Sequence, residues 1–301
     1  MRYFKIIISR TIFLYLACFL AVWHILDYPK AKGNAVAQTM SRFVPGIHYF
    51  GDFVDKHDHF DEFKLHQCIA YHKRVINFFP FQKSEAYQML GFCYDRLGNT
   101  AMAIQSYQAS IKANPEYFWP YYNLGIYAYR KGNYSKAVNY FQQALQKDLK
   151  INMLLMLRSK VFTDVRLSDR PDYNVFEGIK DGREVAYIFM MESLFKIGAY
   201  DQLLGTALAG LKEGFGDQDI FLYYAGKAAF CQKSYEKAVE LLQLALQKNP
   251  HNPDALLYMG LCMRVAGKED LAKNFSVMAR QELRQQGSAI EKYLNTGIRF
   301  F

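Results

Sequence analysis

The hydrophobic and polar positions between residues 84 and 151 follow one pattern that occurs twice, 34 residues apart. In the first copy Tyr87, Leu90 and Tyr94 are spaced by three and four residues, so they share one face of a helix. A second amphipathic series begins after Gly98-Asn99. It ends at Asn114-Pro115, because proline lacks an amide hydrogen and disfavours helical geometry in the residue before it. The pattern therefore predicts two antiparallel helix pairs, each with a turn at a glycine.

The recurring positions carry residues of matching size. They are Tyr87, Leu90, Gly91, Tyr94, Ala103, Tyr107 and Pro115 in the first copy, then Tyr121, Leu124, Gly125, Ala128, Ala137 and Phe141 in the second. A fixed period of about 34 residues indicates a repeat architecture, and this spacing resembles the tetratricopeptide repeat (TPR), a helix-turn-helix unit. The resemblance implies an all-α fold: a right-handed superhelical solenoid of antiparallel helix pairs.

The repetition extends on both sides of these two copies. Residues 55–83 resemble a degenerate opening repeat, in which Cys68, His72 and Val75 occupy places of a second helix. The period breaks over residues 152–183, which we interpret as an insertion, and returns in three copies over 184–286. Residues 287–301 have apolar side chains at helical spacing and are expected to cap the last repeat. An exposed apolar hook for a partner is the alternative for this tail.

The N-terminus favours a membrane anchor. Residues 11–26 are mostly apolar, and the run extends back to residue 4 if Arg10 snorkels toward the headgroups, which reaches the length of a transmembrane helix. Basic residues in the short tail 1–10 favour a cytoplasmic N-terminus. A tether, 27–54, would then lead to a repeat domain outside the cytoplasm, in the periplasm of a bacterium. A signal peptide cleaved after Ala35-Val36-Ala37 and a lipoprotein signal at Cys18 are the alternatives.

Charge and cysteine usage argue against several function classes. The net charge is +9, of which the first 32 residues carry four, so no basic stripe indicates nucleic-acid binding. The five cysteines are scattered without a CxxC pair, and we expect structural thiols rather than disulfides or a zinc ribbon. On a helix His59, Glu62 and His66 would share one face, where they could form a metal or pH-sensitive site. We favour the interpretation that these imidazoles simply lie on the surface.

The sequence predicts neither a cofactor nor an enzyme. No segment resembles a phosphate-binding glycine loop, a serine nucleophile elbow or a paired metal motif. An enzyme with its site in the 152–183 insertion is the minority alternative.

The TPR resemblance also implies where a partner binds. In this family the first helix of each repeat lines a concave groove, through its second, fifth, ninth and twelfth places. The predicted groove residues are Gln88, Phe92, Trp119, Tyr122, Asn123, Ile126, Tyr129, Ile188, Phe195, Tyr223, Lys227, Phe230, Leu257 and Arg264. Trp119 and Tyr122 are expected to face outward as anchors, because aromatic residues dominate binding hot spots. We expect about half of these rings to be exposed, the rest packing against the neighbouring repeat.

Some relatives clamp a C-terminal carboxylate with Lys and Asn at the fifth and ninth places and a further Asn early in the next repeat. Only Asn123 matches that set, since Gln88 and Phe92 occupy the first two places, so we do not expect such a clamp. The sequence therefore predicts a membrane-anchored scaffold that binds an amphipathic helix or extended peptide, in envelope assembly or secretion. A permanent accessory subunit of a larger membrane complex is the alternative.

Overall fold

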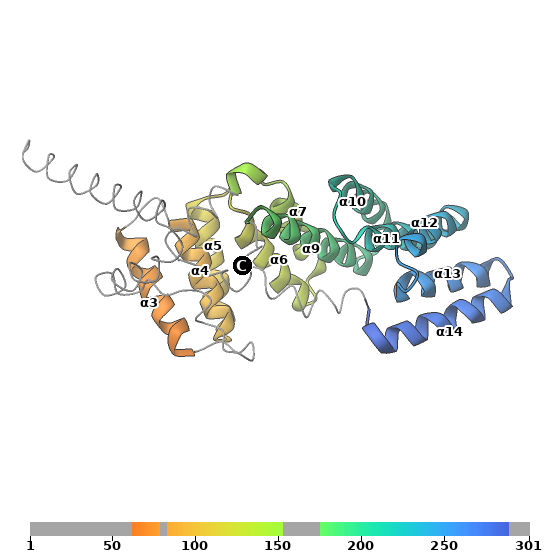
Figure 1. Ribbon diagram of the computed structural model, residues 1–301. Coiled ribbons are helices and arrows are strands. Elements are labelled where there is room, and N and C mark those ends of the chain that lie inside the picture. The colour runs from red at the N-terminus through yellow and green to blue at the C-terminus, as the bar shows by residue number, and fades with distance from the viewer. Residues whose placement is uncertain (1–61, 79–82, 153–174, 289–301) are drawn as a thin grey trace, which may run out of the picture.

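The computed structural model describes residues 62–78, 83–152 and 175–288, and these form helices joined by short turns (Figure 1). The helices are α3 Glu62–Phe78, α4 Lys83–Arg96, α5 Thr100–Ala113, α6 Phe118–Arg130, α7 Tyr134–Leu145, α9 Val175–Lys196, α10 Tyr200–Glu213, α11 Gln218–Cys231, α12 Tyr235–Lys248, α13 Pro253–Val265 and α14 Glu269–Gln286. The predicted all-helical solenoid is confirmed.

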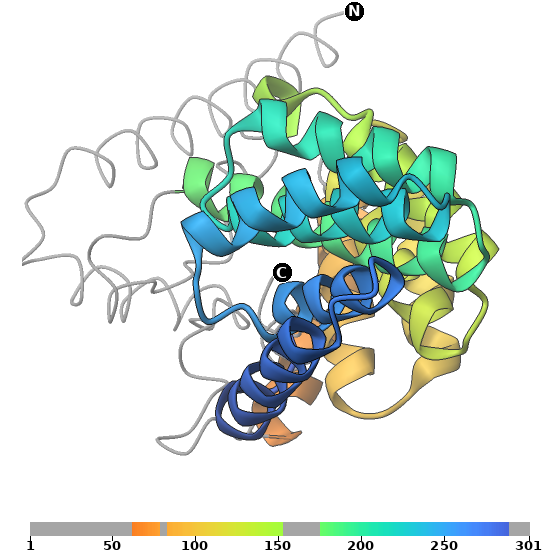
Figure 2. The same cartoon turned by 90° about the vertical axis from the view of Figure 1, so that its right-hand side faces the viewer.

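The helices stand side by side in an elongated array from α3 at one end to α14 at the other (Figure 1). Figure 2 looks along the array from the α14 end, with the blue helices in front. Each helix packs mainly against its neighbours in the chain, and α6, α9, α11 and α13 also contact one another in sequence. The first helices of repeats two to five therefore form one continuous face.

Glycines on the first helix of a repeat leave space for an aromatic ring from the second helix of the same repeat. A methyl group added at Gly91 would lie 2.4 Å from the Tyr107 ring, and one at Gly125 would lie 2.6 Å from the Phe141 ring. Tyr107 and Phe141 are themselves almost completely buried. Each glycine therefore allows the two helices of its repeat to approach closely.

The turn inside each repeat has the same backbone conformation. Gly98, Gly132, Gly198 and Gly267 occupy it with φ of +72° to +73°. The fourth repeat has Lys233 at this place, with φ of +62°. In the first repeat Asn99, which follows Gly98, caps α5 by accepting a hydrogen bond from the Met102 amide.

The core has a large cluster and two small ones. The large cluster extends from Tyr117 before α6 to Cys262 in α13. A separate cluster between α3 and α4 includes Leu65, Cys68 and Leu90. Ala103 and Tyr107 of α5 form a third with Leu124 of α6. Helix α3 packs against α4, and Cys68, His72 and Val75 are buried on it, while a degenerate opening repeat over residues 55–83 stays a prediction.

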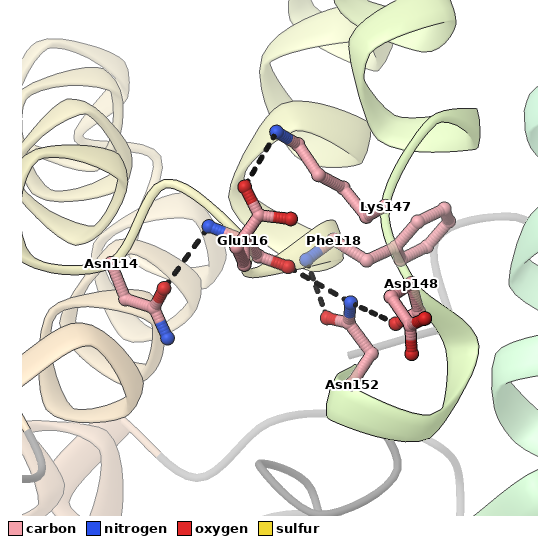
Figure 3. A network of polar contacts seen from close by, with 6 residues as sticks. All are labelled: Asn114, Glu116, Phe118, Lys147, Asp148 and Asn152. Carbon is pink, nitrogen blue, oxygen red and sulfur yellow. Dashed lines mark hydrogen bonds and ion pairs between the residues drawn. The ribbon is translucent and has the colours of Figure 1, made fainter.

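Asn152, a buried residue that follows the second repeat, is hydrogen-bonded to the backbone around the start of α6 (Figure 3). The Asn152 side chain accepts a hydrogen bond from the Phe118 amide (2.7 Å) and donates to the carbonyl oxygens of Glu116 (2.9 Å) and Asp148 (2.8 Å). Lys147 forms an ion pair with Glu116 at 3.7 Å. Asn152 was predicted to begin the insertion, and instead it fixes the N-terminus of α6, because its carboxamide can satisfy a donor and two acceptors together.

The insertion also ends earlier than predicted. Helix α9 begins at Val175, and α7 packs directly against α9. Arg183, predicted as the last residue of the insertion, is buried and donates to the Leu145 carbonyl oxygen (2.9 Å) while pairing with Glu213 (3.3 Å). The guanidinium thereby joins α7, α9 and α10, so the solenoid has resumed before residue 183.

Several sequence predictions lie outside the described residues. The membrane helix (11–26, or from residue 4), the tether and the end of the capping segment fall there. Among the residues that the structure does describe, no helix combines the length and the apolar character needed to cross a membrane.

Candidate partner-binding groove

The groove places of the first helices divide into buried and half-buried rows. At the second, fifth and ninth places of repeats one to four, the side chains are buried, and the predicted residues among them are Gln88, Phe92, Trp119, Tyr122, Ile126, Ile188, Tyr223 and Lys227. In repeats two to four they belong to α6, α9 and α11, which contact one another in sequence, whereas Phe92 of repeat one belongs to the cluster with α3. At the same places of repeat five the surface opens, and Leu257 is 38% exposed.

The prediction that Trp119 and Tyr122 face outward is wrong. Trp119 is 1% exposed and Tyr122 is completely buried. The Trp119 ring packs edge-to-face against Phe118 and Tyr122, and a methyl group at Gly182 would lie 2.7 Å from it. The physical reason is the early start of α9, which places Gly182 against a ring that the sequence analysis left uncovered.

The twelfth places form a row that remains partly accessible. Tyr129, Phe195 and Phe230 are half-buried there in repeats two to four, with Asp95 before them in repeat one and the exposed Arg264 after them in repeat five. Each ring contacts an aromatic residue of its own repeat's second helix, Tyr134, Tyr200 and Tyr235 respectively, with centroids 5.5 to 6.2 Å apart. Of the seven predicted groove rings, these three are half-buried and the other four are buried, so the expectation that about half would be exposed is not met.

A buried charge lies below this row. The Lys227 ammonium is 3.5 Å from Glu192 Oε2 and 3.5 Å from the centre of the Phe195 ring. The rings of Tyr223, Tyr224 and Tyr258 surround it at 5.3, 5.2 and 5.6 Å. Such rings attract a cation electrostatically, so Lys227 is held by one carboxylate and an aromatic box.

Burial and neighbouring charges act in opposite directions on this lysine. Desolvation lowers the pKa of Lys227, while the carboxylates of Glu192 and Asp254 raise it, and burial is the larger effect. Tyr224 donates its hydroxyl to Glu192 at 3.0 Å, and Lys196 pairs with Glu192 at 3.4 Å. Glu192 therefore joins α9 to α11, with Lys196 as its link to the surface.

Sequence analysis missed Glu192 and Tyr258 as members of this cluster. Glu192 and Lys227 occupy the ninth place of consecutive repeats, so opposite charges at one repeat place were a usable signal for their pairing. Tyr258 stands next to a groove place and had no such signal. Its ring contacts Phe230 and Tyr223, with centroids 5.6 and 5.8 Å away, which extends the aromatic surface into repeat five.

The predicted polar groove residues of the first two repeats have unsatisfied atoms. In the part of the chain that the structure describes, neither Nε2 nor Oε1 of the buried Gln88 has a hydrogen-bond partner, and Nδ2 of Asn123 also has none. The fifth place of repeat one carries Gln88 instead of the lysine of a carboxylate clamp. A carboxamide can donate and accept, but these two do not form a carboxylate clamp.

The described ranges contain no cluster of metal-binding side chains. Residues 62–78, 83–152 and 175–288 contain no three His, Cys, Asp or Glu side chains placed to share a metal ion. His59, which the sequence analysis placed on one helix face with Glu62 and His66, lies outside those ranges. His66 forms an exposed pair with Glu62 at 3.8 Å.

Comparison with known proteins agrees with the helix pairs. Tetratricopeptide repeat profiles match residues 84–117, 119–150 and 197–272. The TPR repeat-containing protein MJ1428 of Methanocaldococcus jannaschii is 32% identical over 87 residues, which are 29% of this chain and 15% of that protein. The match therefore spans only a small part of the relative's length.

Two solved structures share the fold. The crystal structure of MamA protein superposes with a TM-score of 0.50 at 15% identity, covering 68% of this chain and 94% of that one. YrrB, described as a TPR protein with an unusual peptide-binding site, gives a TM-score of 0.50 at 12% identity, covering 72% and 94%. With the repeated helix pairs, their glycine turns and the matching profiles, the chain belongs to the tetratricopeptide repeat family.

Proposed function

We propose that this protein is a scaffold that binds a peptide segment of a partner protein along the twelfth-place row and the open groove of repeat five. The observation that carries the proposal is the continuity of half-buried rings from Phe195 through Tyr258 to Phe230, beside the exposed Leu257. Half-buried rings on rigid helices offer large contact area at low entropic cost, which favours hot spots.

The shape and charge of this surface favour an amphipathic guest. Leu257 and the rings would take apolar side chains, while Lys196, whose side chain is 44% exposed, and Arg264 lie beside them and would pair with acidic ones. An amphipathic helix or an extended segment fits this description. The unusual peptide-binding site named for YrrB agrees with peptide binding on this fold without indicating its position here.

Site-specific photo-crosslinking tests the binding surface. A photoreactive residue at Leu257 should capture the partner, whereas the same residue at Leu244, which is 47% exposed but on the second helix of repeat four, should not. Phe230→Ala should weaken binding of the captured partner roughly thirtyfold, as expected for loss of a hot spot worth about 2 kcal/mol. Equal capture from both positions would contradict the assignment.

We further propose that the scaffold is anchored to a membrane through residues 11–26, or 4–26, with the repeats outside the cytoplasm. The apolar run and the basic tail before it support this placement. Carbonate extraction should leave the full-length chain in the membrane fraction, and its release would argue against an anchor. A reporter enzyme active only outside the cytoplasm, fused after residue 288, tests the topology.

A permanent subunit of a larger membrane complex is the second candidate. Exposed apolar side chains on the last helix pair favour it: Val265 is 51% exposed, and Leu271, Val277 and Met278 are 46 to 47% exposed. A subunit would cover such side chains. Constant stoichiometry with one partner through purification, and loss of the chain without that partner, would distinguish a subunit from a reversible scaffold.

A further inference from the structure

Two buried thiols meet between the first two described helices. Cys68 of α3 is 4% exposed and Cys93 of α4 is not exposed, and both belong to the cluster that holds these helices together. Neither residue is in a disulfide, and within this cluster Cys68 is the neighbour with the largest effect on the Cys93 thiol. This effect and burial raise the pKa of the Cys93 thiol well above its ordinary value, so Cys93 remains protonated near neutral pH.

The helix that carries Cys68 is the end of the described array. In the part of the chain that the structure describes, the packing of α3 is against α4, and Phe63 on its other side is 70% exposed. Each repeat contacts only its neighbours in a solenoid, so a terminal helix is held from one side and opens most readily. A covalent bond between α3 and α4 would fix the first described helix to the rest of the array.

We infer that Cys68 and Cys93 are a disulfide-forming pair that crosslinks α3 to α4 when the protein meets a thiol oxidant of the disulfide class. The pairing rests on the interaction between the two thiols, on the shared burial and on the separate helices that carry the two residues. The sequence analysis expected structural thiols, and the inference concerns what these thiols can become. It does not depend on the proposed binding groove.

The reaction follows ordinary thiol–disulfide exchange. The Cys68 thiolate, exposed when α3 opens, attacks one sulfur of the oxidant, and the first oxidant thiol leaves. Cys93 then loses its proton and its sulfur attacks the Cys68 sulfur, releasing the second oxidant thiol. Two protein thiols lose two protons and two electrons, and the oxidant disulfide becomes two thiols. Because the reaction needs α3 to open, its rate should follow the opening of that helix.

The test uses the detergent-solubilised full-length chain in buffers with increasing ratios of oxidised to reduced glutathione. After alkylation of the remaining thiols and digestion with trypsin, peptides 65–73 and 84–96 should appear joined, lighter by two hydrogens than their sum. Oxidation should also slow hydrogen exchange of α3 amides by about tenfold or more, since the crosslink prevents separate opening. The reduced protein should show neither change.

Matched variants separate the pair from general oxidation. Cys68→Ala and Cys93→Ala should each lose the oxidation-dependent protection of α3. Cys262→Ala, which also removes a buried thiol but in α13, should retain it. The inference would be overturned if Cys68 and Cys93 both remained alkylatable in the most oxidising buffer, or if Cys68 were joined to any cysteine other than Cys93. The peptide measurement on the unchanged chain decides this even if a variant fails to fold.

Discussion

Glu192 and Lys227 form an ion pair with 3.5 Å between Oε2 and Nζ, in which both side chains are more than nine-tenths buried. A buried charge without its partner is costly, because neither water nor the surrounding rings replace a carboxylate. The two residues belong to consecutive repeats, so the pair also sets how α9 and α11 lie against each other. The same relationship positions Phe195 over the ammonium.

Removing one charge should cost more than removing both. Lys227→Met leaves Glu192 with the partly exposed Lys196 and should lower the free energy of unfolding by about 3 kcal/mol, as should Glu192→Gln. The double variant should lose clearly less than the sum of the two. Urea unfolding of all four proteins measures the coupling, and additive losses would show that the ions do not depend on each other.

Lys233→Gly should stabilise the fourth repeat. Lys233 has φ of +62°, which costs a residue with a side chain about 1 to 2 kcal/mol, while glycine costs about 0.5 to 1 kcal/mol in backbone entropy. A net gain of roughly 0.5 to 1 kcal/mol in urea unfolding is expected. Gln232→Gly is the control, because Gln232 has φ of −80° and only the entropic cost should appear.

Gly91→Ala should destabilise the first repeat by about 2 to 3 kcal/mol. The added methyl group would lie 2.4 Å from a ring that is 1% exposed, so the helices must separate or Tyr107 must leave its place. Gly205→Ala on the exposed face of α10 meets no atom within 4 Å and should stabilise by roughly 0.5 to 1 kcal/mol. Similar effects at both positions would contradict the close approach of α4 and α5.

Trp119→Ala should destabilise the fold by about 3 to 5 kcal/mol, because it empties a site packed by Phe118, Tyr122 and α9. Thermal unfolding measures the loss. If the variant instead weakened partner binding and left the melting temperature unchanged, the Trp119 ring would face outward, as the sequence suggested.

Alkaline pH should weaken the fold. Burial raises the pKa of Tyr107, Tyr223 and Tyr224 well above the ordinary value of 10.0, and the carboxylate of Glu192 adds to the effect on Tyr224. Above pH 10 the unfolded chain loses phenolic protons that the folded chain keeps, so stability is fully present below pH 10 and falls as pH rises beyond it. Urea midpoints from pH 8 to about pH 11 should show this fall, with phenolate absorbance of the buried tyrosines rising only on unfolding.

Repeat periodicity predicted the helices well because it records local packing. Gly91 and Tyr107, or Gly125 and Phe141, are neighbours within one helix pair, so size matching along the chain was enough. The start of α9 was missed because residues 175–183 carry no repeat signal, and its position depends on contacts of Arg183 with α7 and α10. Burial of Trp119 follows from that start.

Exposure in the groove depends on how closely successive repeats stack, which no single repeat encodes. Tyr122 and Tyr129 both occupy groove places on α6, yet the Tyr122 ring is buried and the Tyr129 ring is half-buried. The twelfth place lies near the end of the first helix, where the turn leaves the ring partly uncovered. Counting aromatic residues at groove places therefore could not tell which of them are buried and which remain partly accessible.

The division of the core also determines how the domain would carry a mechanical load. A pull transmitted along the chain from its N-terminal side reaches α3 first, and α3 belongs to a cluster separate from the large one that begins at Tyr117. The α3 contacts would yield while α6 to α13 remained intact. The small cluster of Ala103, Tyr107 and Leu124 is the next to bear the force. The first described helices would thus act as a release point that protects the groove from tension.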